Sequence, residues 1–134
     1  MKYKLSFLMK GRMLKDLILI IISVMLASIA QVLLKLGMSK VGRIADFRDA
    51  LTKLPSALIS PLVLSGLLVF GISALSWLVV LSRVRLSIAY PMVSLGYVAV
   101  VLFSLFVFKE PIKPVALVGC GVVIIGVILI SRGL

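Results

Sequence analysis

The first apolar segment of the chain reads L-I-L-I-I-I-S-V-M-L-A-S-I-A-Q-V-L-L, residues 17–34, and holds 18 uncharged residues between Asp16 and Lys35. A helix rises about 1.5 Å per residue, so a run of this length approaches the thickness of a hydrocarbon core of about 30 Å. Lipid offers the backbone no hydrogen-bond partner, so a chain inside it must be helical. The run therefore predicts a transmembrane helix.

Three more uncharged runs follow. They contain 29 residues between Lys53 and Arg83, 23 between Arg85 and Lys109, and 18 between Lys113 and Arg132. The first of these carries Pro55 and Pro61 near its start, so its helix is expected to begin close to Pro61 with Ser60 as N-cap. We predict an all-α integral membrane protein, a single domain over residues 1–134 with four transmembrane helices at about 15–36, 61–82, 86–108 and 114–132.

The composition argues against a soluble enzyme. Of 134 residues, 63% are hydrophobic and 14% charged, and the mean hydropathy is +1.31, whereas soluble domains carry roughly 25% charged residues. The sequence has no histidine and one cysteine, Cys120, which excludes an internal disulfide and a Cys/His zinc cluster. No nucleophile–base pair is visible. We therefore expect no catalytic residue, no metal and no cofactor.

The net charge of +11 comes from Lys and Arg residues that flank the apolar runs. This pattern suits anionic lipid headgroups, so we expect membrane lipid and no nucleic acid as a partner. With four spans, the N-terminal side carries eight cations and the other side seven. This small excess favours a cytoplasmic N-terminus and leaves dual insertion, with an antiparallel homodimer, open. We expect the basic leader, residues 1–13, either to lie on the membrane surface or to be disordered.

On the first helix, Ser28, Gln31 and Lys35 share one face at spacings of three and four. An unpaired amide in lipid is unfavourable, so Gln31 needs a partner. Two interpretations remain open for it, an interhelical hydrogen bond or the polar wall of a substrate cavity. Lys35 lies near the end of the span, where it either lines the cavity or extends to the interface.

The third helix carries a stripe of polar and aromatic residues at spacings of three, four and three: Ser87, Tyr90, Ser94 and Tyr97. Pro91 lies within this helix, where it removes one backbone hydrogen bond and predicts a kink. Irregular backbone at membrane depth is tolerated where it lines a cavity. We expect the stripe to line one.

On the fourth helix, Gly119 and Gly126 are seven residues apart and share a face. Small residues let membrane helices approach closely. We therefore predict a dimer interface on this face.

None of the four acidic residues is placed in mid-membrane: Asp16, Asp46, Asp49 and Glu110. Proton-coupled exporters need an intramembrane carboxylate. The charges near the span ends are instead cations: Lys35, Arg83, Arg85 and Lys109. Cations beside a cavity suit an anionic headgroup.

Four motifs carry a family resemblance: L-A-S-I-A-Q-V-L-L-K at 26–35, S-I-A-Y-P-M-V-S-L at 87–95, F-K-E-P-I at 108–112 and G-C-G-V-V-I-I-G-V-I-L-I at 119–130. They resemble those of the four-helix drug/metabolite transporters, and more narrowly the small subunits of the undecaprenyl-phosphate-aminoarabinose flippase. The resemblance covers nearly all of residues 14–132, with Lys109 and Glu110 in the third motif.

The resemblance implies a plasma-membrane transporter that flips a polyprenyl-phosphate-linked amino sugar, working as a homodimer or as a heterodimer with a paralogous subunit. The cavity is then expected to be lined by Gln31, Tyr90, Ser94 and Tyr97. The phosphate is expected to meet Lys35, Arg83 and Arg85 near the interface.

Two departures from related proteins are visible. The similar small multidrug resistance exporters depend on a first-helix glutamate, which this chain replaces with Ala27, Ser28 or Gln31, depending on the alignment. Export of a small amphipathic solute or cationic drug is therefore the alternative, and a non-transporting membrane partner is a third hypothesis. The first loop, through Asp46 and Asp49, is also longer than in the flippase subunits.

Overall fold

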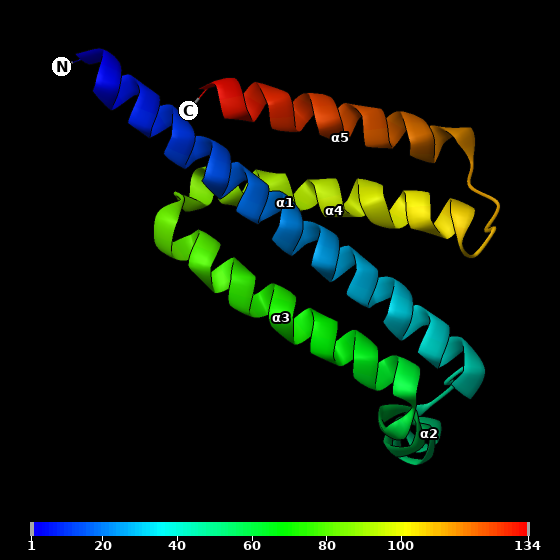
Figure 1. Ribbon diagram of the computed structural model, residues 1–134. Coiled ribbons are helices and arrows are strands. Elements are labelled where there is room, and N and C mark those ends of the chain that lie inside the picture. Colours follow the sequence, from blue (N-terminus) through cyan, green and yellow to red (C-terminus); the bar gives the residue numbers. More distant parts are fainter. Residues whose placement is uncertain (1, 134) are drawn as a thin grey trace.

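The computed structural model describes the backbone of residues 2–133 and the side chains of residues 14–130 and 132. Five helices follow one another: α1 (Lys2–Val41), α2 (Phe47–Ile59), α3 (Pro61–Arg83), α4 (Leu86–Phe106) and α5 (Pro114–Gly133). No strand occurs within residues 2–133. The predicted all-α class is confirmed, and Figure 1 shows the long helices α1, α3, α4 and α5, with the short α2 at one end of α1 and α3.

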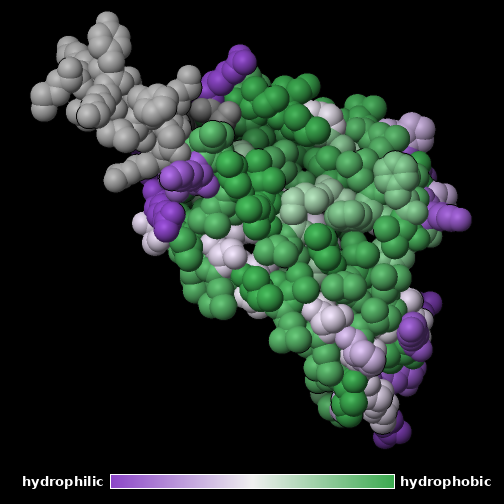
Figure 2. Space-filling view, viewed as in Figure 1, coloured by the Kyte–Doolittle hydropathy of each residue, from purple (hydrophilic) through white to green (hydrophobic). Residues whose placement is uncertain are grey.

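Three helical segments are long and apolar enough to cross a membrane: Leu14–Val41 of α1, α3 and α4. The apolar part of α5, Pro114–Ile130, is shorter, so a fourth crossing stays a prediction. Large apolar side chains are exposed on all these helices, and Figure 2 shows a nearly continuous apolar face with hydrophilic residues at its edges. Such a surface is matched by lipid rather than by water. The chain is a multi-pass membrane protein.

The expected spans fall on helices whose ends differ by a few residues, except in the first. There α1 runs without a break from Lys2 to Val41, beyond the expected 15–36 at both ends. The side chains of the basic leader lie outside the described residues, so its position on the membrane surface stays a prediction. At the start of α3, Ser60 occupies the N-cap and Pro61 the first helical position, although the Ser60 hydroxyl makes no capping bond.

The first loop contains a helix that our sequence analysis did not predict. The Asp46 carboxylate caps α2 by accepting the Asp49 N–H at 2.8 Å, and one turn later Lys53 donates to Asp49 at 2.9 Å. The Lys53 ammonium, together with the Ala45 N–H, holds the pKa of the Asp49 carboxyl below its usual value. Both contacts favour the first turn of the helix.

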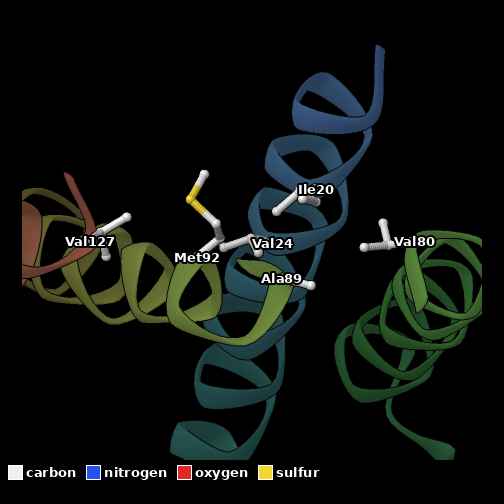
Figure 3. Close-up of a cluster of buried hydrophobic side chains, with 6 residues drawn as sticks. All are labelled: Ile20, Val24, Val80, Ala89, Met92 and Val127. Atoms are coloured by element: carbon white, nitrogen blue, oxygen red, sulfur yellow. The ribbon is translucent and has the colours of Figure 1, made fainter. Parts of the chain in front are cut away.

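Helix α1 is the centre of the bundle. It packs along both α3 and α4, whereas α3 and α4 touch each other only slightly. Within the described residues, α5 packs along α4 alone. Buried side chains from α1, α3, α4 and α5 meet in one cluster, shown in Figure 3: Ile20, Val24, Val80, Ala89, Met92 and Val127.

Two glycines let α1 and α3 approach closely. A Cβ atom at Gly66 of α3 would lie 2.9 Å from Leu34 Cγ and 3.1 Å from the Leu34 backbone nitrogen. A Cβ at Gly37 of α1 would lie 2.5 Å from Val63 Cγ2 and 3.1 Å from the Val63 nitrogen. Because these neighbours include backbone atoms, a side chain would push the helices apart. Close contact of this kind drives helix association in lipid.

A buried hydrogen bond joins the same two helices nearer their middle. The Ser73 hydroxyl of α3 donates to the Ser23 carbonyl of α1 at 2.8 Å, and both serines are buried. Interhelical bonds of this type add about 0.6 kcal/mol on average in membrane proteins. The glycine contacts and this bond together fix α3 against α1 along most of its length.

We predict that Gly66→Ala destabilises the protein, by about 1–3 kcal/mol as for other overpacked cores. Its matched control is Gly71→Ala in the same helix, where a Cβ would meet nothing within 4 Å. Both changes bring the same gain in helix propensity. The measurement is reversible unfolding in mixed detergent micelles, and equal stability of the two variants would contradict the close approach.

Candidate functional site

A groove of about 980 Å³ lies between α3 and α4, with α1 as its floor. From α1 it is lined by Ser23, Val24, Ala27, Ser28 and Gln31, from α3 by Phe70, Ser73, Ala74 and Trp77, and from α4 by Tyr90, Val93, Ser94, Gly96, Tyr97, Val100 and Val101. The groove exists because α3 and α4 each pack along α1 but diverge from each other beyond the turn that joins them (Figure 1).

Four of the residues predicted to bind substrate line this groove: Gln31, Tyr90, Ser94 and Tyr97. Tyr90 and Tyr97 stand one above the other on α4 and are 66% and 67% exposed. Gln31 is also exposed. Within the described part of the chain, no hydrogen bond is formed by the Gln31 amide or by either tyrosine hydroxyl. These polar groups therefore form an open rim with free bonding capacity.

The floor of the groove is polar but internally bonded. The Ser23 hydroxyl donates to the Leu19 carbonyl at 2.9 Å. The Ser28 hydroxyl donates to the Val24 carbonyl at 2.9 Å, and its oxygen lies 3.4 Å from the Gly96 carbonyl of α4. Because these hydroxyls are engaged and both serines are buried, they leave little bonding capacity for a ligand in the groove.

Pro91 does not interrupt α4, which is one helix from Leu86 to Phe106. The Ser94 hydroxyl donates to the Pro91 carbonyl at 2.6 Å. A proline ring removes one hydrogen bond of a helix interior, and this serine adds a side-chain bond to the same turn. The kink itself stays a prediction.

Sequence reasoning missed the whole α3 wall of the groove. Phe70, Ser73 and Trp77 follow one another at spacings of three and four, which is one helical face. That signal was available, but an apolar helix carries many such faces. Gly96 was also missed. A Cβ there would lie 3.1 Å from Val24 Cγ1, so the glycine allows α4 to approach α1.

No lining residue of the groove is charged. The three cations expected to meet the substrate phosphate lie outside it, at opposite ends. Arg83 and Arg85 are exposed where α3 passes into α4. Lys35 lies at the far end of α1, beside the connection between α4 and α5. One phosphate therefore cannot meet all three cations at once.

Lys35 forms an ion pair at its end of the groove. Its ammonium lies 2.9 Å from Glu110 Oε1 and 5.4 Å from the centre of the Phe108 ring. The turn that carries Glu110 needs Lys109 in the left-handed region, at φ 52°, and the Glu110 N–H donates to the Ser104 carbonyl at 3.2 Å. Through these two contacts, Glu110 links Lys35 of α1 to the end of α4.

The predicted dimer glycines lie on a face of α5 that the described residues leave open. Among these residues, a Cβ at Gly119 or at Gly126 would meet nothing within 4 Å. Among the described residues no group of three His, Cys, Asp or Glu side chains lies close enough to hold a metal ion.

The chain matches known transporters over most of its length. Residues 43–132 match the EamA-like transporter family. The chain belongs to the EamA-like transporter family. Among its relatives, a probable 4-amino-4-deoxy-L-arabinose-phosphoundecaprenol flippase subunit ArnF of Erwinia tasmaniensis is 36% identical over 113 residues, which cover 81% of this chain and 87% of the relative.

Two ArnE subunits of the same probable flippase match shorter segments. The subunit of Pseudomonas aeruginosa is 41% identical over 73 residues, covering 54% of this chain and 64% of the relative. That of Pseudomonas savastanoi pv. phaseolicola is 40% identical over 62 residues, covering 46% and 54%. The chain thus spans less than two thirds of the length of these ArnE relatives. No solved structure matches this EamA-like chain.

We predict that Lys35 and Glu110 are energetically coupled. Their side chains are 58% and 43% exposed, and pairs of this kind contribute about 0.2–1 kcal/mol. A double-mutant cycle of Lys35→Met and Glu110→Gln, measured by unfolding in mixed micelles, should give a coupling in this range that falls as salt is added. The control cycle combines Lys40→Met with Glu110→Gln, because Lys40 is also an exposed lysine of α1. In this control, the two changes in unfolding free energy should be additive. Additive effects in the first cycle would exclude the pair.

Proposed function

We propose that this EamA-like chain is a subunit of a plasma-membrane transporter that moves a polyprenyl-phosphate-linked amino sugar between leaflets. It carries out transport and no catalysis. The observation that supports this proposal is the open groove, which is mostly apolar, carries a few uncharged polar and aromatic groups at its rim, and runs along three apolar helices. The names of its ArnE and ArnF relatives point to the same substrate class.

The open side of the groove suits a lipid better than a soluble solute. A sugar headgroup that enters hydrocarbon without hydrogen-bond partners is strongly disfavoured. In the groove, the headgroup would exchange water for the Ser94 oxygen, the Gln31 side-chain amide and the tyrosine hydroxyls. Because α3 and α4 diverge, the polyprenyl chain would stay in the lipid throughout. The groove thus lowers the barrier for the headgroup alone.

The aromatic rim fits an amino sugar. Tyr90, Tyr97 and Trp77 offer ring faces that attract a sugar ammonium group by cation–π interaction, and the partly exposed Ser94 oxygen accepts a hydrogen bond from it. The phosphate would start beside Arg83 and Arg85 and finish beside Lys35, or travel the opposite way. The phosphate would thus meet cations at both ends of the groove, although no charged residue lines the groove itself. When the phosphate arrives at Lys35, it would replace Glu110 as the partner of the Lys35 ammonium.

A second subunit would close the open side. The contact-free face of α5 at Gly119 and Gly126 is where we place that subunit, as a second copy or as a paralogue. Movement would be alternating access, one subunit rocking against the other about the groove. The N-terminus and the turn at Arg83 and Arg85 would face the cytoplasm.

Cation export is the weaker alternative. Coupling to protons needs a carboxylate that binds proton and drug in turn, and no residue lining the groove is Asp or Glu. Expression in a drug-sensitive host, followed by growth on quaternary ammonium compounds, tests it directly. Resistance above the empty vector would favour export over lipid translocation.

We predict that Gln31→Leu together with Tyr97→Leu slows headgroup translocation by about tenfold or more, which corresponds to about 1.4 kcal/mol of lost stabilisation. The measurement uses vesicles that contain the chain, with and without a paralogous subunit, and a polyprenyl-phosphate aminoarabinose probe whose amine is labelled from outside. Leu102→Ala, an exposed change on α4 away from the groove, should leave the rate unchanged. Equal rates for all variants would exclude the groove as the path.

We also predict that Arg83→Ala with Arg85→Ala slows translocation of the same probe, since the phosphate then loses its cationic partners at one end of the groove. The control is Arg132→Ala, an exposed change near the end of α5. An unchanged rate in the double variant would mean that the phosphate does not meet these arginines.

A further inference from the structure

Helix α2 carries an apolar stripe that no described residue of the chain covers. Phe47, Leu51, Leu54 and Leu58 recur at spacings of four, three and four, and their exposed fractions lie between 44% and 79%. Residues at these spacings share one helical face. The residues facing α1 and α3 lie a quarter turn away and include Ala57, which is 1% exposed. The apolar half of α2 is thus partly packed and partly open.

The remaining half of α2 is mostly polar, apart from Pro55 and the exposed Ile59 at the end of the helix. Arg48, Thr52 and Ser56 are all exposed on it, and Asp49 is paired with Lys53. A helix with one apolar and one polar side is suited to a boundary between water and hydrocarbon rather than to either phase alone. This separation of apolar and polar sides distinguishes the stripe of α2 from the general apolarity of the chain.

The place of α2 in the fold puts it at such a boundary. It connects the end of α1 to the start of α3, two helices of membrane-spanning length. Figure 1 shows α2 almost end-on while the four long helices extend across the view, so α2 lies crosswise to them. A helix that lies across the ends of transmembrane helices runs along the membrane surface. In Figure 2 this tip combines hydrophilic with apolar residues.

Cations flank the open stripe. Lys40, Arg43 and Arg48 are exposed at this end of the molecule, whereas the nearby Asp49 is already engaged by Lys53. Unpaired cations at the headgroup level attract anionic lipids. This charge distribution favours the lipid surface over another apolar protein face as the occupant of the stripe.

We propose that α2 is an interfacial anchor, whose stripe of Phe47, Leu51, Leu54 and Leu58 is embedded in the boundary between headgroups and acyl chains while Arg48 and its neighbouring cations bind anionic headgroups. The anchor holds the α1–α3 pair at a fixed depth. It does not depend on transport, because its recognition is confined to one end of the bundle and involves no groove residue.

The test is a nitroxide scan of α2 in the full chain, in a Cys120→Ser background, reconstituted in vesicles of phosphatidylcholine and phosphatidylglycerol. Labels at Leu51, Leu54 and Leu58 should collide with oxygen more than with a water-soluble nickel complex. The matched labels at Thr52 and Ser56 should show the reverse. Nickel access at every position would overturn the proposal, and so would exclusion of both reagents from the stripe, which would indicate a covering protein subunit.

A second arm tests the anionic lipid. In phosphatidylcholine alone, the label at Leu54 should become shallower, with more nickel collisions. Arg48→Gln in the mixed vesicles should shift the label in the same direction, whereas Arg132→Gln, near the end of α5, should not. Identical depths in all four samples would overturn the role of the cations. These results do not depend on translocation, so a failure of the transport proposal would leave them unchanged.

Discussion

The close contact between α1 and α3 is the constraint on which the rest of the structure depends. Gly37 and Gly66 bring the two backbones together at one end, and the Ser73 bond to the Ser23 carbonyl holds them farther along. With α3 fixed on one side of α1, Gly96 brings α4 against the other side. In this arrangement α3 and α4 each pack along α1 and touch each other only slightly. The groove is the space that this arrangement leaves open.

The sequence predicted what depends on hydropathy alone. Long uncharged runs must be helical in lipid, and the starts at Pro61 and Pro114 follow from proline and the flanking charges. It did not predict α2, because Pro55 and the charges around Asp46 suggested a loop. The capping pair Asp46 and Asp49, followed by apolar residues at spacings of four and three, was the signal that could have found it.

Only part of the candidate site could be predicted from the sequence. The stripe on α4 and Gln31 stood out because polar residues are rare in these spans. Ser73 and Trp77 did not, since choosing the inward face of an apolar helix requires knowing which helix it meets. Lys35 and the arginines were grouped by charge, but helix direction separates them. Adjacent helices run in opposite directions, so α1 carries Lys35 away from the turn at Arg83 and Arg85.

The central place of α1 also constrains the order of assembly. The helices that α1 packs against in the described part of the chain, α2, α3 and α4, all follow it in the sequence, so α1 is synthesised before them. It is the most apolar of the three membrane-length helices, and the hydroxyls of Ser23 and Ser28 bond to their own helix. These two serine hydroxyls of α1 are therefore satisfied before α3 and α4 are made. Among the five helices, α5 packs only on α4 within the described residues, so its loss disturbs the fewest neighbours.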